Sequence, residues 1–174
     1  EGLPRAEAAA RRSIALDSSI ASAYLALGTV EMMWRWNPAA ARALIERGLA
    51  LDPQDPEAHV LRGNWFRWQG NWDSALVEAR AAFDLDPLSA ASSNRLARVL
   101  VFARRYDQAE VMYRQTLRDF PPQAGSFAGL ADLYRVTGRM RDALEATREA
   151  AAVGGDSAGL AQLPEVRHDA AAAA

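Results

Sequence analysis

The chain has 174 residues, half of them hydrophobic, and its 20 basic residues nearly balance 22 acidic ones, leaving a formal net charge of −2. Every basic residue is Arg and none forms a long run, so the sequence lacks the dense positive charge that binding to nucleic acid or to an anionic membrane requires. The absence of Cys excludes disulfides and thiolate metal sites. No stretch approaches the roughly 20 apolar residues of a transmembrane helix.

A short motif that ends in Pro recurs along the chain at a fixed spacing. Asp52-Pro53 recurs as Asp86-Pro87, and Phe120-Pro121 follows at the same spacing. Leu16-Asp17-Ser18 precedes the first of these motifs by nearly the same step, with Ser in place of Pro. Because Pro cannot continue a helix, each motif predicts the end of a helical unit. The period of about 34 residues predicts an array of stacked repeats.

The first units in chain order are an incomplete repeat and a complete one. Residues 1–19 fit only the second half of a repeat, by their residues Ala6, Ala10, Ser13 and Leu16. We expect the partner helix of this half to lie upstream of Glu1. Residues 20–54 form the complete repeat, with one residue inserted in its central turn. There, Asn37-Pro38 predicts a helix N-cap followed by Pro in the first helical position, which confines the insertion to the loop.

Three more units keep the same register, at residues 55–88, 89–122 and 123–156. The clearest is 55–88, whose small residues, aromatic residues and closing Pro are Gly63, Phe66, Trp72, Ala75, Ala79, Ala82 and Pro87. Residues 157–174 follow the last unit. We predict a short capping helix from Ser157 to Leu163, ended by Pro164, and then a frayed tail of low complexity.

Across the units, a shared order is visible: an aromatic residue, Leu-Gly or Leu-Ala, a second aromatic residue, Ala and Pro. Individual units lack some of these residues, and the last unit ends in Gly154-Gly155-Asp156 instead of Asp-Pro. This order resembles the tetratricopeptide-repeat (TPR) family, and the resemblance covers nearly the whole chain. It is carried most clearly by Tyr24 with Leu27-Gly28 and by Leu130-Ala131 with Tyr134. The resemblance implies an all-α fold, a right-handed superhelical solenoid of antiparallel helix pairs. It also implies a non-catalytic scaffold that binds a peptide or protein partner.

The chain offers little that could catalyse a reaction, and we predict that it is not an enzyme. His59 occupies a place where TPR units usually carry an aromatic residue, which favours a packed histidine, and His168 falls in the tail. Gly154-Gly155 follows no strand and belongs to no phosphate-binding motif, so we interpret it as a helix stop. Glu145 and Glu149 are interpreted as solvated surface. We expect no metal and no cofactor.

Five Trp residues cluster in the first half of the chain: Trp34, Trp36, Trp65, Trp68 and Trp72. Most of them are predicted to be core residues, with Trp72 just after a turn and Trp65 against small neighbours. Trp34 and Trp36 are predicted to cover the end of their helix. Trp68 alone is placed toward the concave surface, where ligand contact and structural packing both stay open.

In TPR proteins, ligands lie along the concave face that the first helix of each unit lines, and the resemblance therefore implies a partner-binding groove here. Helical spacing selects the side opposite to the packing positions. The residues selected are Leu25, Thr29, Met32, Met33, Val60, Asn64, Arg67, Trp68, Asn94, Arg98, Val101, Phe102, Ala128, Asp132 and Arg135. This mixture suits a peptide with an acid and one or two large apolar side chains. Arg98 is the first choice for a charged contact, because its planar fork can bind a carboxylate at two points.

One TPR subtype binds the C-terminal carboxylate of chaperones through two Lys, two Asn and one Arg. The matching places in this chain hold Leu25, Thr29, Leu61, Ala91 and Arg95. Only Arg95 agrees with the pattern, and the chain has no Lys. A chaperone tail is therefore not the expected ligand.

Two further interpretations stay open. The stretch from Trp34 to Ala41, followed by Arg47 to Pro53, is similar to repeats of bacterial signalling proteins that lie behind cyclase or winged-helix DNA-binding domains. This similarity implies a regulatory region of a larger bacterial protein. The other interpretation is self-assembly into a homo-oligomer through exposed repeat ends. Glu1 to Ala10 lack the pattern of a signal peptide, and a targeting segment upstream of Glu1 stays open. We expect the cytoplasm rather than the periplasm.

Overall fold

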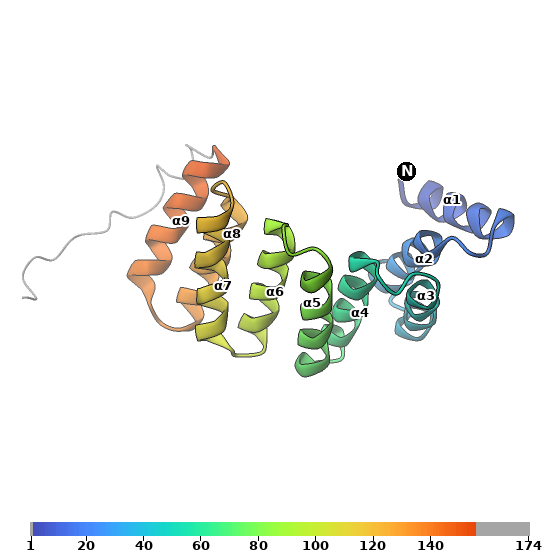
Figure 1. The fold of residues 1–174 in the computed structure, drawn as a ribbon, viewed down its shortest axis with the longest axis horizontal. Coiled ribbons are helices and arrows are strands. Elements are labelled where there is room, and N and C mark those ends of the chain that lie inside the picture. Colours follow the sequence, from blue (N-terminus) through green and yellow to red (C-terminus); the bar gives the residue numbers. More distant parts are fainter. Residues whose placement is uncertain (1, 156–174) are drawn as a thin grey trace, which may run out of the picture. The chain divides into compact units, whose positions relative to one another are not determined.

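The computed structural model describes residues 2–155, and within them every regular element is an α-helix (Figure 1). In chain order these helices are α1 (Gly2–Leu16), α2 (Ala21–Met33), α3 (Pro38–Leu51), α4 (Pro56–Trp68), α5 (Trp72–Leu85), α6 (Ala90–Phe102), α7 (Tyr106–Asp119), α8 (Ala124–Val136) and α9 (Met140–Gly154). The all-α prediction is confirmed for this part of the chain. The predicted helix at 157–163, the tail and His168 lie outside the described residues. None of the described helices is both long and apolar enough to cross a membrane.

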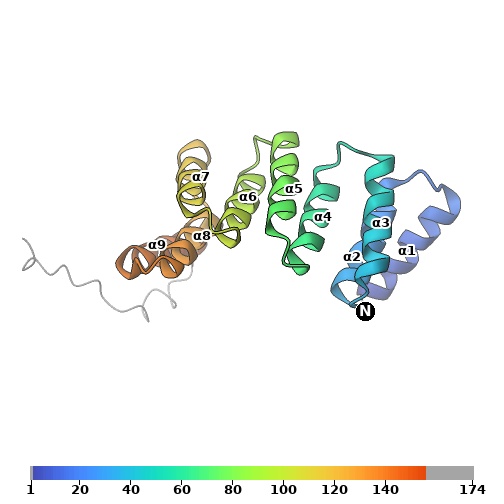
Figure 2. The ribbon, with the colours of Figure 1, turned by 90° about the horizontal axis from the view of Figure 1, so that it is seen from below.

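The helices alternate between two lengths that follow the repeat. The first helix of each unit, α2, α4, α6 or α8, has 13 residues. The second helices are slightly longer. Figures 1 and 2 show α2 beside α3, α4 beside α5, and α8 beside α9. The residue limits of the repeats themselves stay a prediction.

The chain divides into two compact units between Ser92 and Ser93. In the first unit, seven buried residues from α2, α3 and α4 form a core against which Trp65 packs: Leu25, Met32, Ala41, Ile45, Leu49, Ala58 and Leu61. A smaller cluster joins Ala10 of α1 to Ala23 and Leu27 of α2. In the second unit, the largest fully buried side chains are Leu96, Leu100 and Leu133.

Side-chain caps help to fix where several of the described helices begin. The Asn37 side chain accepts a hydrogen bond from the backbone N–H of Ala40, and Pro38 takes the first position of α3, as predicted from the sequence. Asn71 does the same for α5, by accepting from the backbone N–H of Ser74. Asp55 caps α4. The inserted residue of the first complete repeat therefore leaves the start of α3 unchanged.

Each described turn from a first helix to a second helix contains one residue with positive φ. These residues are Trp36, Gly70, Arg104 and Gly138, with φ of 52°, 70°, 58° and 77°. They follow one another at the same interval as the Asp-Pro motifs, so the same turn position recurs from repeat to repeat. Gly adopts this conformation without a steric penalty, whereas Trp36 and Arg104 carry a Cβ that opposes it. Gly155, also at positive φ, ends α9, which confirms the predicted helix stop.

Small residues let neighbouring helices approach closely. A Cβ placed on Gly28 of α2 would lie 3.0 Å from Cγ1 of Ile45 on α3. A Cβ on Gly129 of α8 would lie only 2.4 Å from the ring of Tyr113, a buried residue of α7. Because this ring is enclosed, it cannot swing away without disturbing the packing around it.

The contact between Gly129 and Tyr113 predicts the effect of a single methyl group. Gly129→Ala should lower the free energy of unfolding by about 1 to 3 kcal/mol, because overpacking forces the ring or the helix to shift. Gly125→Ala is the matched control on the same helix, since its Cβ would meet nothing closer than 3.8 Å. That variant should be neutral or stabilising by up to about 1 kcal/mol. Urea unfolding followed by circular dichroism checks both, and equal effects would contradict the packing described.

Candidate functional site

The first unit separates the groove residues predicted from the sequence into buried and accessible ones. Leu25 and Met32 belong to its core and are buried, because they pack against side chains of α3 and α4. They are therefore packing residues and offer no surface to a partner. Thr29 and Val60 are half-buried. The Thr29 hydroxyl donates to the backbone carbonyl of Leu25, so its proton is already engaged.

The accessible residues of the first unit lie toward the ends of its first helices. Met33 is the last residue of α2 and Trp68 the last of α4, and both are exposed. Near the end of α4, the Arg67 guanidinium donates to the side-chain carbonyl of Asn64 over 2.8 Å. The first unit thus presents an apolar surface with a polar pair beside it.

Trp34 and Trp36 differ from the sequence prediction. They were expected to cover the end of their helix as core residues, but their exposed fractions are 63% and 73%. The Trp36 ring, on a residue with positive φ, instead lies against Trp68, where the two rings stack with centroids 5.1 Å apart and planes inclined by 15°. An open cavity of about 380 Å³ lies beside the stack, lined by Trp36, Pro38, Trp68 and Gln69.

This ring pair was not identified from the sequence, although a signal for it exists. Trp36 stands one repeat period before Gly70, at the turn position that favours Gly. Trp65, in contrast, is partly buried against the core as predicted. Its indole N–H donates to the carbonyl of Pro38 over 2.8 Å, and the Arg42 guanidinium lies 5.3 Å from its ring centroid.

In the second unit, one predicted groove residue of α6 bonds to α8. The Ser126 hydroxyl of α8 donates to the side-chain carbonyl of Asn94 on α6 over 2.9 Å. The charges of Arg98 and Asp132 both influence the pKa of the Tyr113 hydroxyl. Burial raises the pKa of that hydroxyl to about 12, while the positive charge of Arg98 lowers it and the negative charge of Asp132 raises it. The charges of Arg98 on α6 and Asp132 on α8 thus both reach this hydroxyl.

The other predicted residues of the second unit differ in their contacts and exposure. Arg135 forms an ion pair with Asp132 on the same helix. Ala128 and Phe102 are exposed, and Val101 is half-buried. Arg98 is exposed and makes no hydrogen bond or ion pair with another described residue. The Arg98 guanidinium is therefore accessible to a carboxylate from outside, and its role as the first charged contact stays a prediction.

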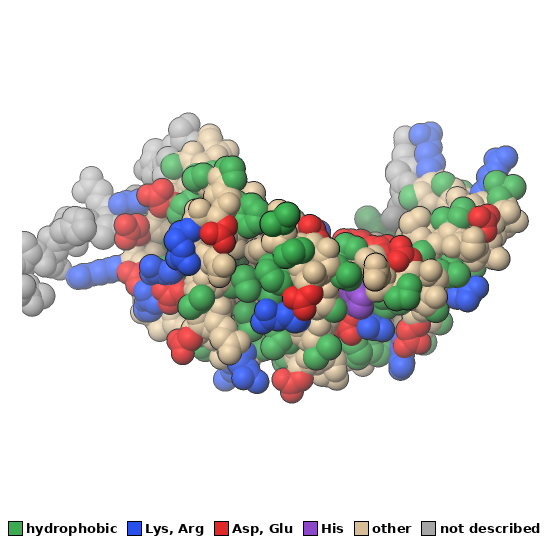
Figure 3. All heavy atoms as spheres, viewed as in Figure 1, with side chains coloured by type: hydrophobic (Ala, Val, Ile, Leu, Met, Phe, Trp, Pro, Cys, Tyr) green, Lys and Arg blue, Asp and Glu red, His purple; other side chains and the backbone are tan. Residues whose placement is uncertain are grey.

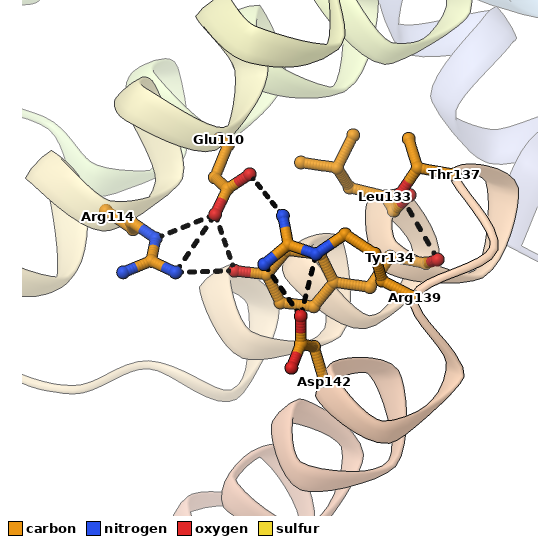
Figure 4. A network of polar contacts seen from close by, with 7 residues as sticks. All are labelled: Glu110, Arg114, Leu133, Tyr134, Thr137, Arg139 and Asp142. Atoms are coloured by element: carbon orange, nitrogen blue, oxygen red, sulfur yellow. Dashed lines mark hydrogen bonds and ion pairs between the residues drawn. The ribbon is translucent and has the colours of Figure 1, made fainter. Parts of the chain in front are cut away.

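A second group of charged residues in the same unit joins α7 to α8 and α9 (Figure 4). Glu110 accepts hydrogen bonds from Arg114, from the Tyr134 hydroxyl and from Arg139, at 3.0, 3.0 and 2.7 Å. Arg139 also bonds to Asp142, and its guanidinium lies 4.2 Å from the centroid of the Tyr134 ring. The groups of this network bond to one another, and the network holds the last helix pair against α7.

These surroundings lower the pKa of Glu110. Burial alone would raise it, but hydrogen bonds from Arg139 and Tyr134 and the charges of Arg139 and Arg114 outweigh burial and bring the pKa below its ordinary value. Glu110 therefore stabilises the fold above the ordinary carboxyl pKa. That contribution is lost as the pH falls through the lowered pKa.

His59 is the packed histidine that the sequence predicted. Its Nδ1 lies 2.9 Å from a carboxylate oxygen of the buried Glu78, and its Nε2 lies 3.2 Å from the carbonyl of Pro53. Arg62 pairs with the same carboxylate oxygen at 2.9 Å. These contacts join α4 to α5 and to the preceding turn. Among the described residues, no group of three His, Asp or Glu side chains could hold a metal ion.

Charges of both signs mix on the surface. On the face seen in Figure 3, described basic side chains lie among acidic and hydrophobic ones and form no extended patch. Glu145 and Glu149 belong to α9, and both are exposed, as predicted.

The Glu110 network predicts a pH-dependent loss of stability. Glu110→Gln should lower the free energy of unfolding by about 1 to 3 kcal/mol near pH 7, because three charge-assisted hydrogen bonds lose their anion. The difference from the unchanged protein should shrink as the pH falls below about 4, where the carboxyl becomes protonated. Glu46→Gln is the control, since its ion pair with Arg42 is exposed and should contribute little. Urea unfolding at several pH values measures the difference, and a difference that stays constant with pH would contradict this account.

Comparison with known proteins identifies the fold. No family model and no curated protein matches the sequence, but solved structures match the fold. The chain is similar to MamA, with 19% identity and a TM-score of 0.68 over 88% of this chain and 89% of MamA. It is similar to YrrB, described as a TPR protein with an unusual peptide-binding site, with 21% identity and a TM-score of 0.66 over 90% of this chain and 80% of YrrB. It is also similar to PilF of Pseudomonas aeruginosa, with 20% identity and a TM-score of 0.69 over 91% of this chain and 80% of PilF. The chain therefore has the all-α helical-repeat fold of the tetratricopeptide-repeat proteins.

Proposed function

We propose that this chain is a protein-interaction scaffold without catalytic activity, and that it binds a peptide or protein segment along its first helices. The observation that carries the proposal is a recurring exposed apolar residue. Each first helix ends with one: Met33 on α2, Trp68 on α4, Phe102 on α6 and Val136 on α8. All four are between 41% and 59% exposed.

Single exposed hydrophobic residues are common on protein surfaces and need no explanation. Four at the same position of four helices are a pattern, because each repeat leaves water in contact with a side chain that could be buried. Covering such a side chain contributes up to roughly 1.5 to 3 kcal/mol. We therefore define the partner-binding residues as Met33, Trp68, Phe102 and Val136, two in each compact unit.

Charge in the second unit indicates what else the partner carries. Arg98 is exposed, and Asp132, the other charge that acts on Tyr113, already pairs with Arg135. A carboxylate of the partner would accept hydrogen bonds from the Arg98 guanidinium. The proposed ligand is thus a segment with large apolar side chains and at least one acid.

The contacts of the side chains that could act in catalysis support a binding role over a catalytic one. His59 is held between Glu78 and a backbone carbonyl, and Glu110 is held by three partners. In these contacts both side chains connect helices and stabilise the fold. The TPR fold of YrrB with its peptide-binding site adds support by likeness.

Selection from a random peptide library displayed on phage tests the proposal. Peptides with an acid and large apolar residues should be enriched on the immobilised chain. Arg98→Glu should weaken the enriched peptides by roughly 1 to 3 kcal/mol, as for a lost charge-assisted bond. Arg118→Glu is the matched control, with the same change of charge at an exposed position on α7.

Two results would count against the proposal. If no peptide family is enriched, or if both substitutions weaken binding equally, the first helices are not the binding surface. Light scattering over a range of concentrations tests the alternative of self-assembly. A concentration-dependent dimer that buries the partner-binding residues would favour a homo-oligomer.

A further inference from the structure

The turn that contains Trp36 is unusual among the described turns between a first and a second helix. The equivalent positive-φ position holds Gly70, Arg104 and Gly138 in the other three described turns. Gly adopts this conformation freely, whereas Trp36 and Arg104 hold it with a side chain. Among the four positions, only Trp36 places an aromatic ring there, and it is 73% exposed, which suggests a role in binding.

The conformation of this turn places two indole rings together at the surface. Trp36 stacks on Trp68, and the cavity beside them continues over Pro38 and Gln69. The backbone beneath is well fixed, because Asn37 caps α3 and the indole of Trp65 bonds to the carbonyl of Pro38. The pair is therefore a preorganised aromatic surface, whose rings need little ordering when a ligand arrives.

The groups that line the cavity decide which ligand complements it. None of the four carries a formal charge. Both indoles present an N–H that can donate but not accept, and the Gln69 amide adds further donors. The electrostatic complement is an uncharged segment that offers carbonyl acceptors and flat apolar rings. A polyproline II segment has both, because its Pro rings are apolar and its carbonyls form no internal hydrogen bonds.

We propose that Trp36 and Trp68 form a docking site for a proline-rich segment of a protein partner in the polyproline II conformation. The proposal rests on the proposed scaffold function and names the ligand class at the first unit. Pro residues of the segment pack on the two rings, and its carbonyls accept hydrogen bonds from the indole N–H groups and from Gln69. A proline-rich chain also loses little conformational freedom on binding, because it is extended beforehand.

Titration with decaproline, acetylated and amidated at its ends, tests the site directly. The probe is added to the ¹⁵N-labelled chain while the indole N–H signals are followed by NMR. We expect the signals of Trp36 and Trp68 to shift saturably below about 1 mM peptide. The signal of Trp65 should stay in place, since its N–H is bonded within the chain. A Gly-Ser peptide of equal length should cause no shift.

Three variants separate binding from folding. Trp36→Gly removes the ring and places at the positive-φ position the residue that adopts it freely, so the chain should keep its unfolding midpoint and lose affinity for decaproline about tenfold or more. Trp68→Ala should lose affinity to a similar extent. Trp34→Ala is the matched control, because this ring is 63% exposed but lines neither the stack nor the cavity. It should bind decaproline as the unchanged chain does.

Several outcomes would overturn the proposal. It fails if decaproline leaves the Trp36 and Trp68 signals in place, or if Trp36→Gly and Trp68→Ala both retain affinity. It also fails if maltohexaose shifts these signals and decaproline does not, which would indicate a sugar site. Shifts that depend only on protein concentration would indicate a second copy and overturn it too. In each case, library peptides that depend on Arg98 would still support the scaffold function, so the two proposals fail separately.

Discussion

The close approach of neighbouring helices at small residues is the constraint on which the rest of the structure depends. Gly28 admits Ile45, Gly63 lies against Cβ of Glu78, and Gly129 lies against the ring of Tyr113. Because backbone meets side chain at these points, the distance between the helices is fixed at the contact. The turn that follows each first helix has little freedom once this distance is set. The exposed ends of the first helices therefore recur at the same position of each repeat.

Paired carboxylates between the helices complement this packing. Glu78 lies inside the first unit and is neutralised by Arg62 and contacted by His59, while Glu110 in the second unit is surrounded by two Arg and a Tyr. Such groups stabilise a fold only when their partners are in place, and removing one partner leaves an uncompensated charge. These carboxylates thus favour one arrangement of the helices around them. Glu78 is buried and Glu110 half-buried, and both are paired within the chain, whereas Arg98 is exposed.

Much of the fold follows from the sequence, because Pro, Asn-Pro and Gly act through local backbone geometry. The repeat period, the cap at Asn37 and the stop at Gly155 are of this kind. The site was harder to predict. Met32 and Met33 are adjacent, yet one is buried and the other exposed, since successive helical residues point about 100° apart. The Trp36 ring depends on the backbone of a single turn, and Arg139 of one helix pair reaches Glu110 of the preceding pair. Neither can be inferred from spacing along one helix.

The stack of Trp36 on Trp68 has a mechanical consequence within the first unit. Trp36 belongs to the turn between α2 and α3, whereas Trp68 ends α4, so the two rings connect neighbouring helix pairs on their solvent side. Flexing between these pairs would slide or part the rings and alter the electronic coupling of two stacked indoles. The near-ultraviolet circular dichroism of the two stacked indoles should therefore change when the first two complete repeats bend relative to each other.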